Sequence, residues 1–272
     1  MHKQALTPAA LFDVEGMTAV ITGGGAGIGL AYAKAMADNG ARVVLLDADP
    51  AAIETALADL TAAGADASGI VVDITDSRAL GKAVDRAAAP FRRLDILFAN
   101  AGITAGPGFL TTEGSRNPEG AIENIAPALW EKVVATNLTS VFATIRACVP
   151  HMKRQESGSI VVTTSIAGLR PSAVVGTPYM IAKAGAAHLV RQAAVELARY
   201  GIRVNAIAPG PFLTRITSPG LQSIWESALP VGRVATTDEM QGLALFLASG
   251  ASGYVSGAQF VIDGGSTLGR AA

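Results

Sequence analysis

Tyr179 and Lys183 stand four positions apart in the stretch PYMIAK. A phenol can donate or accept a proton, but its ordinary pKa is about 10. Residues four apart on a helix lie one turn from each other on the same face, and a nearby ammonium favours the phenolate. The spacing therefore predicts a proton shuttle, with Tyr179 as general acid/base and Lys183 lowering its pKa toward neutrality. Such a group accelerates a reaction by about 10²–10⁴-fold.

A glycine-rich turn, TGGGAGIG, occupies residues 22–29, directly after the first apolar run. Small residues let the backbone approach phosphates, and the N-terminus of the next helix contributes N–H groups and a positive dipole end. A glycine cluster alone also fits a tight turn, but its place between a strand and a helix favours dinucleotide binding. The expected contacts are Gly23, Gly25, Ala26, Gly27, Ile28 and Gly29.

Asp47 ends the second apolar run, 18 residues after Gly29. A carboxylate there can accept hydrogen bonds from the adenosine ribose hydroxyls and would repel a 2′-phosphate. No basic residue stands at Ala26 or Ala48 to neutralise that phosphate. The sequence therefore predicts NAD rather than NADP, with a loop cap as the structural alternative for Asp47.

Two further polar residues are candidates for the catalytic centre. Ser165 follows an apolar strand, and its hydroxyl could stabilise charge on a reacting oxygen; a structural role is the alternative. Asn137 lies in an otherwise apolar helical segment, where an amide must find partners or cost stability. A satisfied core asparagine or a helix kink is the alternative for Asn137.

Short apolar runs alternate with longer amphipathic segments along the chain, which indicates an α/β protein. The runs are rich in β-branched residues without polar alternation, as in strands buried on both faces. The expected strands are Thr18–Ile21, Arg42–Leu46, Gly69–Val72, Leu94–Phe98, Ser159–Thr163, Arg203–Ile207 and Gln259–Ile262. The expected helices include Ile28–Asn39, Ala51–Ala63, Ser77–Ala89, Leu129–Met152 and Ile181–Tyr200. We therefore predict a Rossmann-like, doubly wound, seven-stranded parallel sheet with helices on both faces and ligands at the carboxyl ends of the strands.

The 272 residues suit a single domain, with residues 1–15 as an N-terminal extension. Residues 103–127 and 211–234 interrupt the alternation and are expected near the substrate. For residues 211–234, a helical flap and a packed surface helix are both open. The expected pocket is mainly apolar and includes Ile166, Phe109 and Trp225, with Arg170 and Arg215 as possible polar contacts.

Composition excludes several function classes. With a net charge of −1, the chain carries no electrostatic footprint for nucleic acid or an anionic membrane. No run reaches about 18 uninterrupted apolar residues, so no membrane-spanning helix is expected. Cys148 is the only cysteine, which rules out an internal disulfide and suits a reducing cytoplasm. The three histidines show no metal-ligand spacing, and no metal is expected.

Taken together, these motifs resemble the short-chain dehydrogenase/reductase family from about Gly16 to Gly265. The matching elements are TGGGAGIG, Asp73-Ile74, Asn100-Ala101-Gly102, Asn137, Ser165, Tyr179 with Lys183, and Pro209-Gly210-Pro211. Two departures are mild: Ala99 stands where the family often has asparagine, and the interval from Ser165 to Tyr179 is one residue longer than usual.

The resemblance implies roles for several residues. Asp73 and Ile74 would contact the adenine, and Asn100, Ala101 and Gly102 would line the cofactor. Pro209, Gly210, Phe212 and Thr214 would surround the nicotinamide carboxamide. Tyr179 and Lys183 would also contact the cofactor, and Asn137 would position a water that connects Lys183 to solvent. A homotetramer is implied, with interfaces on the two long helices and on the C-terminal strand.

The resulting prediction is an NAD-dependent oxidoreductase that interconverts a secondary alcohol and a ketone on a small molecule, with Tyr179 as acid/base. An NADP-dependent carbonyl or 3-oxoacyl reductase is the alternative, because it would share every catalytic residue. A non-catalytic dinucleotide sensor is a further alternative from a different class.

Overall fold

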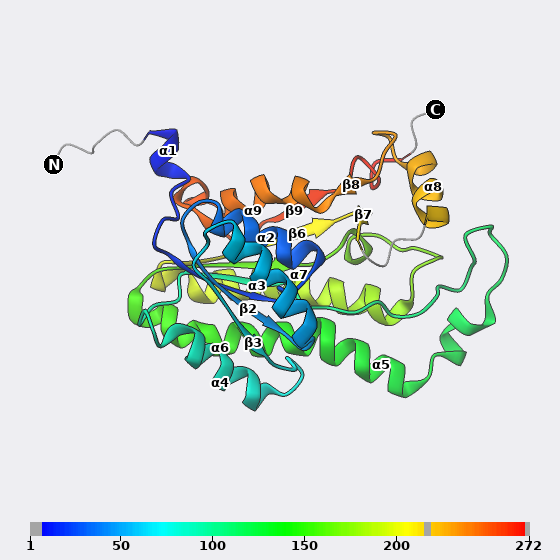
Figure 1. Cartoon of the computed structure of the whole chain (residues 1–272). Coiled ribbons are helices and arrows are strands. Elements are labelled where there is room, and N and C mark those ends of the chain that lie inside the picture. Colours follow the sequence, from blue (N-terminus) through cyan, green and yellow to red (C-terminus); the bar gives the residue numbers. More distant parts are fainter. Residues whose placement is uncertain (1–6, 215–218, 270–272) are drawn as a thin grey trace.

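The protein is described by a computed structural model that covers residues 7–214 and 219–269 (Figure 1). Its centre is a seven-stranded sheet in the order β3-β2-β1-β4-β5-β6-β9, in which every neighbouring pair is parallel. The strands are β1 (Thr18–Thr22), β2 (Arg42–Asp47), β3 (Ala67–Val71), β4 (Ile96–Ala99), β5 (Gly158–Thr163), β6 (Ile202–Pro209) and β9 (Gln259–Ile262). The predicted fold class and strand number are confirmed.

Helices cover both faces of the sheet. One apolar cluster joins the sheet to α2 (Gly27–Ala37), α3 (Pro50–Ala62) and α9 (Gln241–Ala248). The other joins it to α4 (Ser77–Ala88), α6 (Ser140–Gln155) and α7 (Thr177–Leu197). The remaining helical elements are α1 (Pro8–Leu11), α5 (Pro127–Val134), α8 (Pro219–Ala228), η1 (Pro118–Gly120), η2 (Ile122–Asn124), η3 (Ala135–Thr139), η4 (Ile166–Gly168), η5 (Ala198–Tyr200), η6 (Thr237–Met240) and η7 (Gly250–Ser252).

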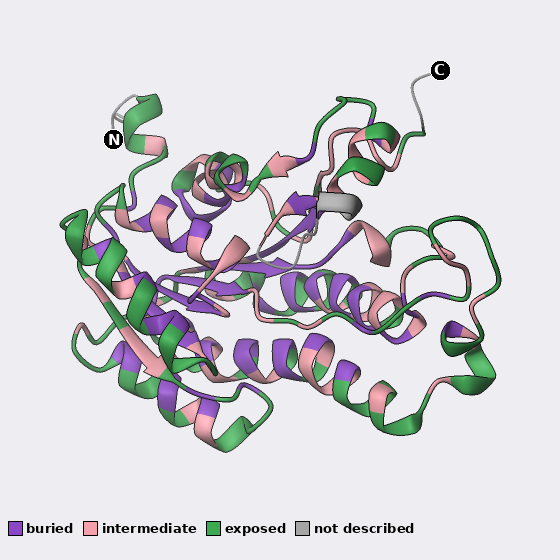
Figure 2. Ribbon diagram, turned by 45° about the vertical axis from the view of Figure 1, so that its right-hand side comes forward, coloured by how far each residue is buried: buried purple, intermediate pink, exposed green. Residues whose placement is uncertain are grey.

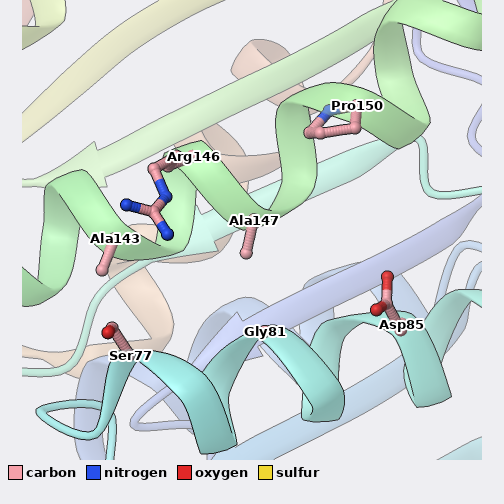
Figure 3. Close-up of a pocket in the computed structure, with 7 residues that line it drawn as sticks. All are labelled: Ser77, Gly81, Asp85, Ala143, Arg146, Ala147 and Pro150. Atoms are coloured by element: carbon pink, nitrogen blue, oxygen red, sulfur yellow. The ribbon is translucent and has the colours of Figure 1, made fainter.

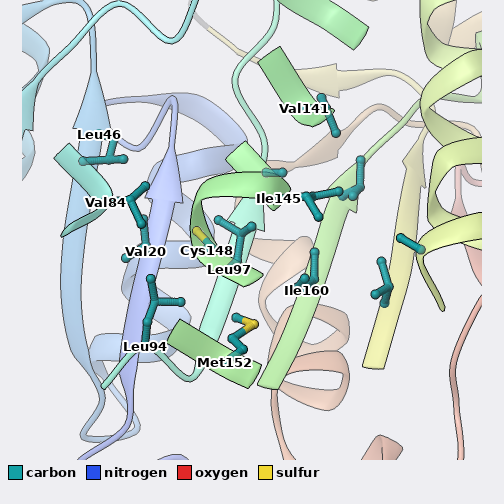
Figure 4. Packing of buried hydrophobic residues seen from close by; sticks show 14 of the residues in the cluster. Val20, Leu46, Val84, Leu94, Leu97, Val141, Ile145, Cys148, Met152 and Ile160 are labelled. Carbon is teal, nitrogen blue, oxygen red and sulfur yellow. The ribbon is translucent and has the colours of Figure 1, made fainter. Parts of the chain in front are cut away.

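The central strands are buried and the edge strands are not (Figure 2). All five residues of β1 and all four of β4 are buried, and their side chains alternate between the two apolar clusters. Figure 4 shows one cluster, in which Val20 and Leu97 of the sheet pack with Ile145 and Cys148 of α6. In β3 and β9, by contrast, no residue is fully buried, so the expectation of strands buried on both faces is wrong at the two sheet edges.

Two helix predictions need correction at their boundaries. The expected helix at 129–152 is interrupted by one π-helical turn, η3, between α5 and α6. The helix expected from Ile181 begins at Thr177 instead, with Pro178 in its first turn, where proline lacks only an N–H that has no helical partner. Because of this earlier start, Tyr179 and Lys183 lie on the same helix.

The run Pro127–Gln155 is the one helix, among the described residues, whose length and hydropathy alone would allow it to cross a membrane. Its buried side chains, including Val141, Ile145 and Met152, belong to the apolar cluster against the sheet. This packing identifies the run as a core helix.

The two irregular segments lie toward the same end of the molecule in Figure 1. Residues 103–126 form a long excursion between β4 and α5 that contains η1 and η2. After β6 the chain forms β7 (Phe212–Leu213), α8 and β8 (Ala235–Thr236), and β7 pairs with β8 in a small parallel sheet. Both alternatives for residues 211–234, a helical flap and a packed surface helix, include a helix, and α8 is that helix.

Candidate active site

Tyr179, Ser165 and Lys183 meet where β5 ends and α7 begins. The Ser165 oxygen accepts a hydrogen bond from the Ala167 N–H at 3.1 Å, and the serine hydroxyl bonds the Tyr179 phenol. Lys183 is almost fully buried and donates from Nζ to the Thr163 carbonyl oxygen at 2.8 Å. Its Nζ lies 5.7 Å from the centre of the Tyr179 ring. The spacing read from the sequence thus does place the ammonium beside the phenol.

The protonation of this trio differs from the prediction. Burial raises the pKa of Tyr179, and the bond from Ser165 lowers it by less. Burial also lowers the pKa of Lys183 to about 8, because a desolvated ammonium is less stable than the neutral amine. The expected lowering of the Tyr179 pKa is therefore wrong for the protein alone, because burial raises this pKa by more than the bond from Ser165 lowers it.

Asn137 is completely buried in the π-helical turn η3. Its Nδ2 donates to the carbonyls of Ile103 at 3.0 Å and Val133 at 3.2 Å, and its Oδ1 accepts from the Ile103 N–H at 3.2 Å. The side chain is thus a satisfied core amide at a helix irregularity, as the structural alternative expected. It is also adjacent to the site, since a Cβ on Gly102 would lie 2.5 Å from Asn137 Oδ1 and 3.5 Å from Lys183 Nζ.

Asn100 fixes the glycine-rich turn to the sheet. Its Nδ2 donates to the carbonyls of Thr22 at 3.2 Å and Gly23 at 3.3 Å, and its backbone N–H donates to Thr22 Oγ1 at 3.0 Å. The Ala101 N–H reaches the same oxygen at 3.2 Å. Gly23 has a φ of +63° and a Cβ there would lie 2.9 Å from the Ala101 Cα, so only glycine suits this position.

The N-terminus of α2 differs from those of the two helices that follow it. Asp49 and Asp76 cap α3 and α4 through their side chains, whereas Ala26 at the start of α2 makes no side-chain cap. Among residues 7–214 and 219–269, the nearest atom to a Cβ on Gly27 would be the Thr214 methyl carbon, at 4.0 Å. The start of α2 therefore lacks the aspartate side-chain cap of the next two helices, which suits a bound phosphate group.

Asp47 stands at the carboxyl end of β2, beside this turn. Its Oδ2 accepts from the Gly25 N–H at 3.0 Å, and its Oδ1 accepts from the Asp49 N–H at 3.1 Å. These two bonds orient the carboxylate and leave further acceptor capacity on both oxygens. The loop-cap alternative and the ribose-binding prediction are thus compatible, because the carboxylate can serve both.

The other predicted cofactor contacts also lie at the carboxyl ends of strands. Asp73 follows β3, is exposed, and accepts from Thr75 Oγ1 at 2.7 Å and the Thr75 N–H at 2.8 Å, which lowers its pKa. Ile74 is buried in the apolar core. At the end of β6, the Gly210 N–H donates to the Ile262 carbonyl at 2.9 Å after Pro209. Phe212 is buried in β7, and Thr214 follows that strand.

The predicted substrate-pocket residues come from three segments. Ile166 begins η4 directly after Ser165, Phe109 lies in the excursion after β4 with 41% of its surface exposed, and Trp225 is half-buried on α8. Arg170 donates from Nη2 to the Ser266 carbonyl at 2.6 Å and so ties this region to the C-terminal segment. Arg215 lies outside the described residues.

Thr163 and Thr22 were not predicted as site residues, yet they organise the site. Thr163 accepts from Lys183 through its carbonyl and donates from Oγ1 to Asn100 Oδ1 at 3.0 Å. It also contacts the buried Tyr32 hydroxyl at 3.3 Å. Both threonines stand at the carboxyl ends of strands that border the site, and this position was the only indication in the sequence that they belong to it.

Other polar groups lie apart from this site. Across residues 7–214 and 219–269 there is no group of three or more His, Cys, Asp or Glu side chains that could hold a metal. Cys148 is fully buried, and burial raises the pKa of its thiol. A surface groove of about 250 Å³ between α4 and α6 contains Asp85 and Arg146 (Figure 3), but none of its lining residues is a predicted site residue.

Comparison with known proteins places these features in a family. A family profile described as "Enoyl-(Acyl carrier protein) reductase" matches residues 23–267. The chain is 38% identical to cis-4-hydroxycyclohexanecarboxylate dehydrogenase of Sinomonas cyclohexanicum, over 92% of this chain and 96% of that protein. It is 35% identical to 2,5-dichloro-2,5-cyclohexadiene-1,4-diol dehydrogenase LinX of Sphingobium indicum, over 94% and 98% of the two chains.

Solved structures agree with the sequence relatives. A 7α-hydroxysteroid dehydrogenase, in complex with NADH and 7-oxo glycochenodeoxycholic acid, superimposes with a TM-score of 0.85 at 30% identity. The match covers 97% of this chain and 98% of that one. With the parallel sheet, the glycine-rich turn and the Ser165–Tyr179–Lys183 geometry, these matches establish that the chain belongs to the short-chain dehydrogenase/reductase family.

Proposed function

We propose that this protein is an NAD-dependent dehydrogenase that oxidises a secondary alcohol on an alicyclic ring to the ketone, and reduces the ketone in reverse. The reaction class follows from the family, whose members act on CH–OH groups with NAD or NADP. The observation that carries the proposal is the Tyr179 phenol, held by Ser165 one helical turn from the buried Lys183.

The site residues divide the proton chemistry among them. Bound nicotinamide would accept or return the hydride. Tyr179 removes the hydroxyl proton during oxidation and returns it during reduction. Ser165 donates a hydrogen bond beside the Tyr179 phenol. A bond to the phenol oxygen favours its deprotonated form, and a bond to the reacting oxygen of the substrate stabilises charge on that oxygen. Lys183, with a pKa of about 8, is mostly protonated near neutral pH, and its positive charge favours the deprotonated phenol.

The cofactor would be held by the glycine-rich turn and the carboxyl ends of β2 to β6. The uncapped start of α2 suits the phosphate groups, and Asp47 suits the adenosine ribose hydroxyls. What supports NAD over NADP is the carboxylate of Asp47 without a neighbouring basic residue at Ala26 or Ala48.

Replacing Asp47 tests this preference. The ratio of kcat/KM with NAD to kcat/KM with NADP should fall by at least about tenfold in Asp47→Ala, because repulsion of the 2′-phosphate disappears with the carboxylate. Glu54→Ala is the matched control, since it removes an exposed carboxylate on α3 that is not among the predicted cofactor contacts. An unchanged ratio in Asp47→Ala would contradict the ribose role.

Two observations support a ring alcohol over a 3-oxoacyl thioester. The relatives at 38% and 35% identity are named for cyclohexane and cyclohexadiene alcohols, and the solved neighbour for a steroid alcohol. In addition, the excursion after β4 carries Glu113, Glu119, Glu123 and Arg116, a net charge of 1 − 3 = −2. An anionic carrier or coenzyme thioester would be repelled there.

A spectrophotometric screen tests the proposal. Purified protein is offered cyclohexanols, cyclic diols, sterols, polyols and 3-hydroxyacyl thioesters with NAD or NADP, and formation of the reduced nicotinamide is followed by absorbance. Turnover of ring alcohols with NAD is the expected result. Turnover confined to 3-hydroxyacyl thioesters with NADP would overturn the proposal in favour of the reductase alternative. Binding of NADH without turnover of any alcohol would favour the sensor alternative.

We also propose a homotetramer. The support is a set of exposed apolar side chains on the two long helices and in the C-terminal segment, where a soluble monomer rarely gathers them. These side chains are Phe142, Ile181, Val195, Tyr254, Val261 and Leu268.

A further inference from the structure

The excursion after β4 is docked onto the loop that joins the two catalytic residues Ser165 and Tyr179. The Leu110 N–H donates to the Ala173 carbonyl at 2.9 Å, and the Gly108 N–H donates to the Val174 carbonyl at 3.3 Å. Pro107 and Val175 form an antiparallel bridge beside these bonds. Main-chain pairing therefore connects a segment more than sixty residues upstream to the catalytic loop.

Glycines allow the backbones in this region to touch. A Cβ on Gly108 would overlap the Ala173 carbonyl oxygen, and one on Gly120 would overlap the Gly108 carbonyl oxygen. A Cβ on Gly176 would overlap the Ala105 carbonyl oxygen. None of the three has a positive φ, so close approach, and not backbone conformation, is what requires glycine at these positions.

The catalytic loop is also held at its other end. Gly168 in η4 packs against the main chain of α7, where its Cβ would lie 2.8 Å from Lys183 C and Ala184 N. The loop between Ser165 and Tyr179 is thus fixed by Gly168 at its start and by the excursion near its end. Its middle carries the exposed apolar side chains of Leu169 and Val174.

We propose that Gly108, Gly120 and Gly176 form a backbone clamp that positions the loop between Ser165 and Tyr179, and that residues 106–124 thereby act as the wall that selects the substrate. This inference rests on the proposed alcohol dehydrogenase function. The three glycines are positioning residues, because they act through the loop. Phe109, next to the clamp, is the side chain of this wall that would contact an apolar ring.

Alanine at Gly108 opens the clamp without straining φ, so Gly108→Ala is the main test. Gly114→Asn is the matched control: Gly114 lies in the same excursion with open space around it and a φ of +86°, which asparagine tolerates. Phe109→Ala removes the ring and leaves the clamp in place, and it serves as a second variant should Gly108→Ala fold poorly.

Hydrogen exchange gives a readout that does not need turnover. Peptides covering residues 166–178 should exchange at least about tenfold faster in Gly108→Ala than in the unmodified enzyme or in Gly114→Asn. NADH affinity should stay within about twofold, because the glycine-rich turn is untouched. Unchanged exchange in residues 166–178 would overturn the clamp.

Kinetic selectivity gives the second readout. The ratio of kcat/KM for a cyclohexanol to kcat/KM for 2-propanol should change by at least about tenfold in Gly108→Ala and in Phe109→Ala, but not in Gly114→Asn. Faster exchange with an unchanged ratio would overturn the role in substrate selection. Absence of turnover by the unmodified enzyme would instead refute the proposed function. In that case, the hydrogen-exchange comparison alone would test whether the three glycines position the loop.

Discussion

At the scale of single residues, burial disfavours the charged form of both the Tyr179 and the Lys183 side chain. Burial raises the pKa of the Tyr179 phenol and lowers that of the Lys183 ammonium to about 8. The bond from Ser165 is the contact that moves the Tyr179 pKa back toward neutrality. The protein therefore places its proton shuttle where burial raises the Tyr179 pKa, and the hydrogen bond from Ser165 offsets part of that effect.

Loss of Ser165 should move the pH profile of alcohol oxidation. Oxidation needs the deprotonated phenol, so kcat/KM rises as pH passes upward through the Tyr179 pKa. Ser165→Ala removes the bond that lowers this pKa, so the rising limb should shift to higher pH and kcat should fall by about 10²–10³-fold. Ser165→Thr, which keeps a hydroxyl, is the control. A limb that stays at the same pH in Ser165→Ala would contradict this account of the serine.

Sequence reasoning identified the groups with distinctive spacing and missed those without it. Tyr179, Lys183 and Asn137 stood out because of their motif or their apolar surroundings. Thr163 and Thr22 are common residues at strand ends, and their roles depend on contacts across 20 and 78 residues of chain, respectively. Burial likewise determines the direction in which the Tyr179 pKa is shifted. The four-residue spacing of Tyr179 and Lys183 does not reveal how deeply they are buried.

At the scale of elements, the seven strands were predictable because their apolar runs are continuous. The π-helical turn was not, since residues 135–139 have the same apolar pattern as the helices on either side. The contact of residues 106–124 with the loop between Ser165 and Tyr179 was also not predictable from the sequence. Gly108 and Gly120 look like ordinary loop glycines until the backbone that each one touches is known.

The start of β1 holds an uncompensated polar group. Thr18 Oγ1 is buried and has no hydrogen-bond partner within residues 7–214 and 219–269, although the Thr18 N–H donates to Asp95 Oδ2 at 2.8 Å. Thr18→Val keeps the shape and removes the unpaired hydroxyl, so it should raise the free energy of unfolding by about 1 kcal/mol in urea titrations.

Thr22→Val is the matched control at the other end of the same strand. Its hydroxyl accepts from the Asn100 and Ala101 N–H groups, so this substitution should destabilise the protein by about 1–3 kcal/mol. Equal effects of the two substitutions would show that the Thr18 hydroxyl has a partner after all.

At the scale of the whole molecule, the charge and the exposed surface agree with a small-molecule enzyme that associates with itself. Charged residues make up only 16% of the chain, and apolar side chains are exposed on α6, α7 and the C-terminal segment. The glycine-rich turn and the catalytic trio lie at the carboxyl ends of the strands, while the proposed contacts between subunits lie on α6, α7 and the C-terminal segment.

A charge on the outer face of α7 should therefore disturb assembly. Val195 has 80% of its surface exposed, and Val195→Glu should shift the sedimentation coefficient from a tetramer toward smaller species at micromolar concentration. Val71→Glu, at the exposed sheet edge, should leave the tetramer intact. A monomer in the unmodified protein at that concentration would rule out the homotetramer.

The most direct test of the central claim is the turnover of Tyr179→Phe beside its affinity for NADH. The substitution removes one hydroxyl and preserves the ring, so NADH should bind within about twofold of the unmodified enzyme. Oxidation of the best ring alcohol should fall by at least about 10²-fold, because the variant lacks the phenol hydroxyl that is proposed to take the substrate proton. Turnover that persists with intact NADH binding would contradict Tyr179 as the proton shuttle.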